Sequence, residues 1–434
     1  MRLNLIKYLI FLFFALFFTA CSSKFSEPIE PFLRLEFEQN ATILPKIKSG
    51  FNADTKKFLE KYFAVWNLEK PTNKLAFTKL KIEALWGLKY ADKAYARFDS
   101  HGTNYDEAFL NSIKFNANES EFGKIWLPAI MTNNALLRNL PTNAPIYGNP
   151  KKAGEGYPFD YASISALGVA YPLLVSHFSK DGEWAFVQND TVWGWIQSSN
   201  LKILDENLAE IYKNSNFLAI LKDNAQIYDE NNATIFLARS GTILPYESQN
   251  NAEFSGKFLN KTGFKKYFVN SNDASKFPAK LNNENLQILT NSLISQSYGW
   301  GGTSFLRDCS LMTKDFLANF GIWLPRNSKA QSNAGLKYEL SEFSNTEKLE
   351  FIKTHGIAYR TILYLSGHIM LYVGEINGEV AVLHSVWGLR TIDDGRALIA
   401  KTALTTLEIG KNRPDIAKDR LLLSRINAIT ILGK

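Results

Sequence analysis

The chain has 434 residues, of which 46% are hydrophobic and 21% charged, so its composition is that of a globular protein rather than a disordered or low-complexity chain. Its 49 Lys and Arg residues against 42 Asp and Glu residues give a net charge of +7, which is too diffuse over this length to indicate nucleic-acid binding. Two cysteines exclude a disulfide framework, and none of the five histidines pairs with another at the i, i+4 spacing of zinc peptidases. We therefore expect no metal site and no cofactor.

The amino terminus is typical of a bacterial export signal. Two basic residues precede an unbroken apolar run over residues 8–18, which is too short to span a bilayer. Small residues then lead to Cys21, in an order that resembles a bacterial lipobox. We expect residues 1–20 to be a lipoprotein signal peptide, Cys21 to be lipidated, and the anchored protein to face the periplasm or cell wall. The alternative is an ordinary signal peptide cut near Ala20, with Cys21 incidental.

Residues 21–135 are expected to form a mostly helical amino-terminal domain. Residues 58–63 and 75–90 have apolar positions three and four apart, which is the spacing of an amphipathic helix. Few turn signals interrupt this part of the chain.

Two regions of short β-rich segments follow, each separated by turn residues, and each predicts a small β-barrel. The first covers residues 136–204, with strands expected at 171–178, 184–188 and 193–196, and the second covers residues 205–268, with strands expected at 218–221, 225–228, 234–238 and 242–244. Residues 269–290 are rich in Asn, Ser, Lys and Pro and are interpreted as a linker.

The last region, residues 291–434, predicts an α+β domain. A glycine-rich turn at residues 299–302 lets the backbone approach a substrate closely, and a helix then opens at Cys309 and stops at Gly321. Strands are expected at residues 361–365, 368–373 and 380–384, and an Asn-Gly turn joins the last two.

Cys309 is the candidate nucleophile. At the first turn of a helix, the macrodipole and free N–H groups are expected to lower the pKa of its thiol. A thiolate nucleophile needs a histidine as base and acid and a third group to orient that histidine, and only His368 and His384 lie on predicted strands of this domain. The alternatives are a buried structural thiol at Cys309 and a surface histidine at His384. The polar neighbours of Cys309 argue against burial in an apolar core.

Five segments in this domain resemble the NlpC family of papain-like cysteine peptidases, which cut bacterial cell-wall peptides: residues 298–302, 308–310, 321–328, 367–374 and 383–384. The resemblance implies Cys309 as nucleophile, His368 as general base and acid, and His384 as the orienting member. It also implies that the substrate is bound by Tyr298, Asp308 and Ser310.

Residues 140–160 and 182–187 look like the first bacterial SH3-like domain of a subgroup that has an amino-terminal domain and two such barrels. The subgroup is similar to endopeptidases that cut between γ-D-glutamate and a diamino acid in stem peptides with a free amino-terminal L-alanine. There the first barrel caps the cleft, and an acid and a tyrosine receive the ammonium. Asp160 and Tyr157 are the candidates for these roles, with Glu155 third.

The resemblance therefore implies a helical domain, two SH3-like β-barrels and a papain-like α+β peptidase domain. The expected partners are peptidoglycan stem peptides and, through the anchor, a lipid bilayer. Two rival functions are a non-catalytic wall-binding lipoprotein and an amidase or acyltransferase on the same frame.

The proposed histidine pair also predicts a strand register. A plain two-residue turn at Asn377-Gly378 makes opposed residue numbers sum to 755, which places His368 and His384 on opposite faces of the sheet. One β-bulge, or a loop of three or five residues, restores an even sum such as 754 and lets the rings meet. We therefore predict that this hairpin is not a simple two-residue turn.

Overall fold

The computed structural model describes residues 30–48, 50–92 and 97–433, and residues 33–434 form one compact unit. Within its amino-terminal part lie the α-helices α2 (Thr55–Tyr62), α3 (Lys74–Ala84) and α4 (Glu107–Asn116) and 3-10 helices at Ala41–Ile43, Ala64–Asn67, Leu85–Ala91 and Glu119–Glu121. Each of the three α-helices is preceded by an Asn or Asp whose side chain accepts a hydrogen bond from a first-turn N–H. The helix expected over residues 75–90 is an α-helix only as far as Ala84, and the chain then continues as a 3-10 helix.

The first barrel, residues 127–203, is a seven-stranded antiparallel sheet in the order β3-β2-β6-β5-β4-β1-β7. Its strands are β1 (Leu127–Met131), β2 (Ala135–Arg138), β3 (Ser163–Leu167), β4 (Pro172–Phe178), β5 (Trp184–Gln188), β6 (Trp193–Gln197) and β7 (Leu201–Ile203). β1 begins before residue 136 and pairs with both β4 and β7, so the sheet starts earlier than the sequence pattern indicated.

The second barrel, residues 217–276, follows helix α5 (Glu206–Lys213) and has a three-stranded sheet, β11-β8-β15, and a five-stranded sheet, β10-β9-β14-β13-β12. Its strands are β8 (Phe217–Ile220), β9 (Ala225–Tyr228), β10 (Thr234–Ala238), β11 (Ile243–Pro245), β12 (Ser248–Gln249), β13 (Glu253–Leu259), β14 (Phe264–Asn270) and β15 (Ala274–Lys276).

The segment 269–290, interpreted from its composition as a linker, is largely ordered structure. Strand β15 pairs with β8 of the second barrel, and most of helix α6 (Asn283–Leu293) lies in this segment. Leu286, Leu289 and Leu293 of α6 are buried in the core of the next domain. The segment therefore contains the last strand of the second barrel and the first helix of the carboxy-terminal domain.

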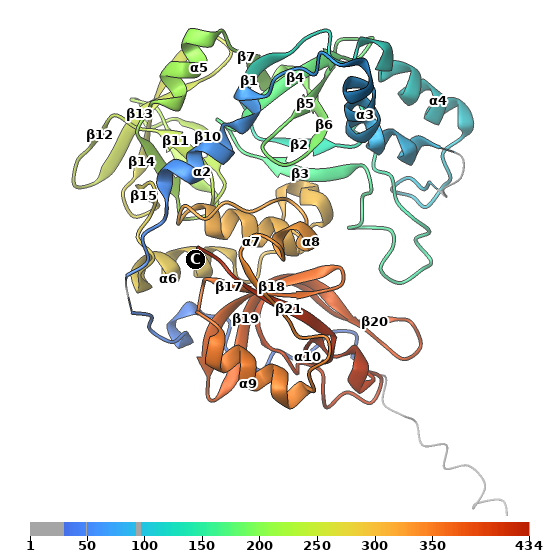
Figure 1. The fold of residues 1–434 in the computed structure, drawn as a ribbon, viewed down its shortest axis with the longest axis vertical. Helices are drawn as coiled ribbons and strands as arrows, with labels where there is room; N and C mark the ends of the chain where they lie inside the picture. Colours follow the sequence, from blue (N-terminus) through green and yellow to red (C-terminus); the bar gives the residue numbers. More distant parts are fainter. Residues whose placement is uncertain (1–29, 49, 93–96, 434) are drawn as a thin grey trace, which may run out of the picture. The chain divides into compact units, whose positions relative to one another are not determined.

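The carboxy-terminal domain has a six-stranded sheet in the order β16-β21-β17-β18-β19-β20, with α7 on one side and α9 on the other (Figure 1). The helices after α6 are α7 (Cys309–Ala318), α8 (Ser328–Gln331), α9 (Asn345–His355) and α10 (Leu422–Arg425), with 3-10 segments at Trp300–Phe305 and Lys418–Arg420. The strands are β16 (Leu336–Glu339), β17 (Thr361–Leu365), β18 (His368–Ile376), β19 (Glu379–Arg390), β20 (Arg396–Thr406) and β21 (Ile426–Ile431). The helix–sheet layers confirm the expected α+β class.

Candidate active site

Cys309 is the first residue of α7, and its side chain is almost fully buried. Asp308 caps the helix by accepting a hydrogen bond from the Leu311 N–H at 2.8 Å, while the Ser310 hydroxyl donates to the same carboxylate at 3.1 Å. The sulfur lies near the start of β18, close enough for the backbone N–H of Ile369 to lower the pKa of the thiol. The helix start thus brings the thiol beside the residue that follows His368.

Arg326 is bonded to two polar side chains at the start of this helix. Its guanidinium makes a two-pronged ion pair with Asp308, at 2.6 and 3.1 Å, and donates to the Ser310 hydroxyl at 2.9 Å. Its Nε donates to the hydroxyl of Ser165, on β3 of the first barrel, at 3.2 Å. Asp308 and Ser310, expected to bind substrate, are therefore engaged within the protein, and sequence reasoning assigned no role to Arg326 although it lies in one of the matching segments.

The environment of Cys309 reverses the expected shift of its pKa. Burial raises the pKa of the thiol to about 12, and the neighbouring charge of Asp308 adds to that rise. The N–H groups of Ile369 and Ser310 oppose it without overcoming it. In the free protein the sulfur therefore keeps its proton, and a base must remove it when a substrate arrives.

The base candidate is His368, the first residue of β18. Its Nε2 lies 2.8 Å from Nδ1 of His384 on β19, and Nε2 of His384 lies 3.0 Å from the hydroxyl of Thr405 on β20. Three neighbouring strands therefore contribute one polar group each to a continuous hydrogen-bonded chain. Such a chain sets the orientation of the first imidazole, because the ring cannot rotate without breaking it.

A β-bulge makes this chain possible. The hairpin closes through the two residues Asn377 and Gly378, and Ile376 pairs with Glu379, a sum of 755. Between Tyr372 and Gly374 the register shifts, so that Tyr372 opposes Val382 and Leu371 opposes Leu383, sums of 754. The turn itself is the plain Asn-Gly type, with positive φ at both residues, and the bulge restores the even register. The predicted departure from a simple hairpin is confirmed.

Both imidazoles are held neutral. Burial lowers the pKa of His368 to about 4, and the charge of Arg425 lowers it further while Asp308 opposes the shift. Burial places the pKa of His384 well below its usual value. The His368 ring is therefore unprotonated at neutral pH, which is the state that a general base requires.

Tyr298 lies close to the nucleophile but is enclosed by aromatic rings. Its ring packs against Trp387 of β19 and Phe159 of the first barrel, both with centroids 6.0 Å away, and Phe159 also contacts Trp300 at 5.6 Å. Burial, with the nearby charge of Asp308, raises the pKa of Tyr298 well above its usual value. Its hydroxyl therefore stays protonated and able to donate a hydrogen bond.

The glycine-rich turn approaches the first barrel rather than an open cleft. A Cβ on Gly301 would lie 2.2 Å from the Ser163 carbonyl oxygen, and one on Gly302 would lie 2.5 Å from the Ala166 nitrogen, both on β3. Gly301 and Gly302 also have positive φ angles of 59° and 83°. The turn thus needs glycines in order to dock the peptidase domain against β3.

Asp160, the expected ammonium receptor, has its partners within the first barrel. Asp160 is buried, forms an ion pair with Arg138 at 3.2 Å, and accepts hydrogen bonds from the N–H groups of Ile146 and Ala162. These contacts hold the loop of the first barrel in place and occupy the carboxylate. Tyr157 is 64% exposed, and Glu155 is half-buried on the same loop.

The described residues contain no group of three or more His, Cys, Asp or Glu side chains that could hold a metal ion. Among residues 30–433 as the structure describes them, none of the helices has the length and apolarity that a membrane span requires. Cys21, the expected lipidation site, lies outside the described residues.

Comparison with protein families agrees with this arrangement. Residues 145–197 match the SH3 domain of SH3b1 type, residues 205–250 match the SH3 domain of SH3b2 type, and residues 295–393 match the NlpC/P60 family. No curated protein sequence matches the chain. The chain is thus built from two bacterial SH3 domains followed by an NlpC/P60 cysteine peptidase domain, as the sequence resemblance implied.

Two solved structures are similar to this one. An NlpC/P60 endopeptidase from Photobacterium damselae subsp. piscicida is 26% identical, with a TM-score of 0.78, and the match covers 92% of this chain and 98% of that one. An NlpC/P60 family protein from Bacillus cereus is 16% identical, with a TM-score of 0.46, over 70% of this chain and 98% of that one. The first likeness extends over the helical region, both barrels and the peptidase domain.

Proposed function

We propose that this chain is a lipid-anchored cell-wall cysteine endopeptidase that hydrolyses the bond between γ-D-glutamate and a diamino acid in murein stem peptides with a free amino-terminal L-alanine. The observation that carries the proposal is the placement of Cys309 against the start of β18, where His368 is hydrogen-bonded to His384. A thiol, an imidazole and a group that orients the imidazole are what nucleophilic acyl transfer requires. The NlpC/P60 family, whose peptidases act on peptidoglycan peptides, supports the substrate class.

The first half of the reaction forms a thioester. His368 removes the thiol proton as the sulfur of Cys309 attacks the γ-carbonyl carbon of D-glutamate, and the carbonyl oxygen becomes an oxyanion. Backbone N–H groups at the start of α7 and the Tyr298 hydroxyl are the donors available to it. When the tetrahedral intermediate collapses, the C–N bond breaks and the amine leaves with the proton from His368.

The second half releases the acid product. His368 takes a proton from a water molecule, and the resulting hydroxide attacks the thioester carbonyl. The C–S bond breaks, the thiolate regains the proton from His368, and the γ-carboxylic acid departs and loses its proton to water. His384 and Thr405 keep the His368 ring in one orientation through both halves.

The first barrel supports the requirement for a free amino terminus. Its loop places Phe159 on the aromatic group around Tyr298, which closes that side of the site. An ammonium buried there needs a carboxylate partner. Because Asp160 is engaged with Arg138, Glu155 is the acidic candidate on this loop.

The test uses the purified full chain, a free stem peptide containing L-Ala-γ-D-Glu-diaminopimelate, and the same peptide with an acetylated amino terminus. We expect cleavage after D-glutamate in the free peptide, seen by mass spectrometry, a much slower reaction on the acetylated one, and none with Cys309→Ala. Cys21→Ala is the matched control, because it removes the other cysteine: it should cleave at the normal rate but no longer take up a fatty-acid label in cells.

Normal turnover by Cys309→Ala would refute the nucleophile. Binding without cleavage by the wild type would indicate a wall-binding lipoprotein, and cleavage or acyl transfer at another bond would indicate an amidase or acyltransferase. Equal rates on blocked and free peptides would refute the free-terminus requirement.

A further inference from the structure

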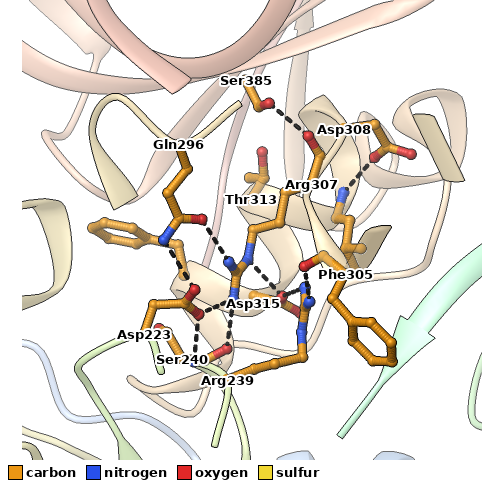
Figure 2. A network of polar contacts seen from close by, with 12 residues as sticks. Asp223, Arg239, Ser240, Gln296, Phe305, Arg307, Asp308, Thr313, Asp315 and Ser385 are labelled. Carbon is orange, nitrogen blue, oxygen red and sulfur yellow. Dashed lines mark hydrogen bonds and ion pairs between the residues drawn. The ribbon is translucent and has the colours of Figure 1, made fainter. Parts of the chain in front are cut away.

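A group of buried charges joins the second barrel to the residue two positions before the nucleophile. Arg307 is 1% exposed and lies at its centre (Figure 2). The other members of this group, which we call the Arg307 network, are Asp223, Arg239, Gln296 and Asp315.

The contacts of the guanidinium reach two domains. From Arg307, one nitrogen donates to Asp223 at 2.6 Å, Nε donates to Asp315 of α7 at 2.8 Å, and a third nitrogen donates to Gln296 at 3.0 Å. Asp223 lies in the turn between β8 and β9 of the second barrel, where its carboxylate also accepts from the Gln296 amide at 2.9 Å. Arg239, which follows β10, donates to Asp315 at 2.9 Å and to the carbonyl of Phe305.

The main chain of Arg307 leads directly into the catalytic helix. Its carbonyl accepts hydrogen bonds from the Ser385 hydroxyl at 2.7 Å and from the Gly299 N–H at 3.0 Å, and the next residue, Asp308, caps α7 (Figure 2). A shift of the Arg307 side chain is therefore passed to the segment that carries Cys309. The network also holds the turn that precedes Arg307, because Arg239 donates a hydrogen bond to the Phe305 carbonyl.

Charge balance makes Asp223 the sensitive member. Two arginines face two aspartates, and all four side chains are at most 16% exposed. Burial by itself raises the pKa of Asp223, but the charge and hydrogen bonds of Arg307 outweigh burial and lower it to about 2. Without this carboxylate, two buried guanidinium groups would share one partner, Asp315, and repel each other.

We propose that Asp223 of the second barrel is a positioning residue for Cys309: by neutralising Arg307 it fixes the segment 305–309 in the geometry that hydrolysis needs. The proposal rests on the proposed function of Cys309. It gives the second barrel a part in the reaction although Asp223 touches neither the nucleophile nor the two histidines.

The test compares Asp223→Asn with Asp273→Asn. Asp273 pairs with Lys222 at 3.3 Å inside the same barrel, so its variant removes a neighbouring ion pair that does not reach Arg307. For each folded variant we measure kcat per titratable thiol, KM on the free stem peptide, and amide exchange of the segment 298–311. The titration is made in a Cys21→Ala background, where Cys309 is the only thiol.

We expect Asp223→Asn to lower kcat about 10-fold at a KM changed by no more than about two-fold, because misplacement of a nucleophile affects the chemical step rather than binding. Exchange over residues 298–311 should rise about 10-fold while β13 and β14 stay protected. Asp273→Asn should leave kcat, KM and this exchange within about two-fold of the wild type. Asp223→Glu, which keeps a carboxylate, should recover most of the lost kcat.

A lower thermal midpoint for Asp223→Asn, with kcat per thiol and exchange over 298–311 unchanged, would overturn the proposal, because the network would then only join two domains. If Asp223→Asn fails to fold, Asp223→Glu takes its place, with a smaller loss of kcat and a smaller rise in exchange expected. The exchange readout needs no substrate: if the wild type cleaves no stem peptide but exchange still rises in the variant, the proposed function fails and the coupling stands.

Discussion

The two barrels share a small β-rich architecture but contact α7 in different ways. Near the start of α7 the first barrel offers neutral groups: Ser165 accepts from Arg326, the Ser163 hydroxyl donates to the Gly301 carbonyl at 2.8 Å, and Phe159 packs on Tyr298. The second barrel offers charges, Asp223 and Arg239, to the side chains of Arg307 and Asp315, which precede and follow Cys309. The first barrel therefore packs against the start of α7 through neutral groups, and the second barrel neutralises buried charges on either side of Cys309.

The difference matters because removing a charged contact costs more free energy than removing a neutral one. A lost neutral hydrogen bond in a buried site costs about 1 kcal/mol, whereas removal of one partner of a buried ion pair leaves an uncompensated charge and costs about 3–5 kcal/mol. The first barrel does contribute one buried charge to α7: Asp190 pairs with Lys314 at 2.9 Å. That contact lies five residues after Cys309, away from the helix start.

The largest effect is expected from Arg326→Met, which removes the partner of the helix-capping Asp308. The substitution leaves a buried carboxylate unpaired, so we expect a loss of about 3–5 kcal/mol in stability and almost complete loss of hydrolysis. Thermal unfolding and peptide cleavage measure both. Arg390→Met is the control, because the Arg390–Asp394 pair is largely exposed and worth at most about 1 kcal/mol. If Arg326→Met retained full activity, the cap would not depend on this arginine.

Asp190→Asn tests whether position on α7, rather than charge alone, decides the effect on catalysis. Asp190 is completely buried and accepts hydrogen bonds from Lys314 and, at 2.7 Å, from the Trp323 indole N–H. We expect a loss of about 3 kcal/mol in stability, with kcat per titrated thiol within about three-fold of the wild type. A fall in kcat as large as that expected for Asp223→Asn would show that any buried charge on α7 positions the nucleophile.

How much of this molecule the sequence predicts depends on how local each feature is. The strands that were predicted from local alternation and turn residues agree with the structure to within a few residues, apart from the extensions of β18 and β19. The other strands, among them β13 and β14 of the second barrel and β20 and β21 of the carboxy-terminal sheet, were not predicted. The bulge in the β18–β19 hairpin followed from parity once two histidines had to meet. Helix α6 was missed because the Asn-rich composition outweighed a local signal, namely the Asn282 cap and buried leucines three and four residues apart.

The partners of the buried aspartates are distant from them in sequence. Asp160 is paired with Arg138, 22 residues away, and Asp223 with Arg307, 84 residues away, and no local pattern reveals such partners. The thiol pKa was misjudged for a related reason. The helix start was visible in the sequence, but the burial that outweighs it arises only when the sheet packs against α7.

Mild acid is expected to destabilise the first barrel but not the second. His177 of the first barrel is buried, with Nε2 3.1 Å from the Ala117 carbonyl, and burial lowers its pKa to about 4 although Glu121 partly opposes the shift. As pH falls from about 6.5 towards 4, the unfolded chain binds a proton that the folded barrel rejects, so stability is lost at about 1.4 kcal/mol per pH unit. At pH 5 the first barrel should be weaker by about 2 kcal/mol.

The second barrel lacks histidine, and the pKa of its Asp223 lies near 2, so its contribution is kept above about pH 4 and is lost only below that. Amide exchange at pH 7 and pH 5, corrected for the intrinsic rate, should therefore rise in β4 and β5 and not in β13 and β14. His177→Gln should remove the pH dependence of the first barrel. Equal loosening of both barrels in the wild type would assign the acid sensitivity to another group.

The smallest effect is expected from Ser165→Ala, the neutral counterpart of Asp223→Asn. The substitution deletes one hydrogen-bond acceptor of Arg326, at 3.2 Å, while the ion pair of Arg326 with Asp308 and its bond to Ser310 remain. We expect a loss of about 1.5 kcal/mol in stability, the low end for a hydrogen bond to a charged group, and at most about a three-fold fall in kcat, because no charge is left without a partner. Amide exchange over residues 298–311 should stay close to the wild type. If Ser165→Ala lowered kcat as far as Asp223→Asn does, the neutral contacts of the first barrel would position Cys309 as strongly as the charges of the second, and the distinction between the barrels would fail.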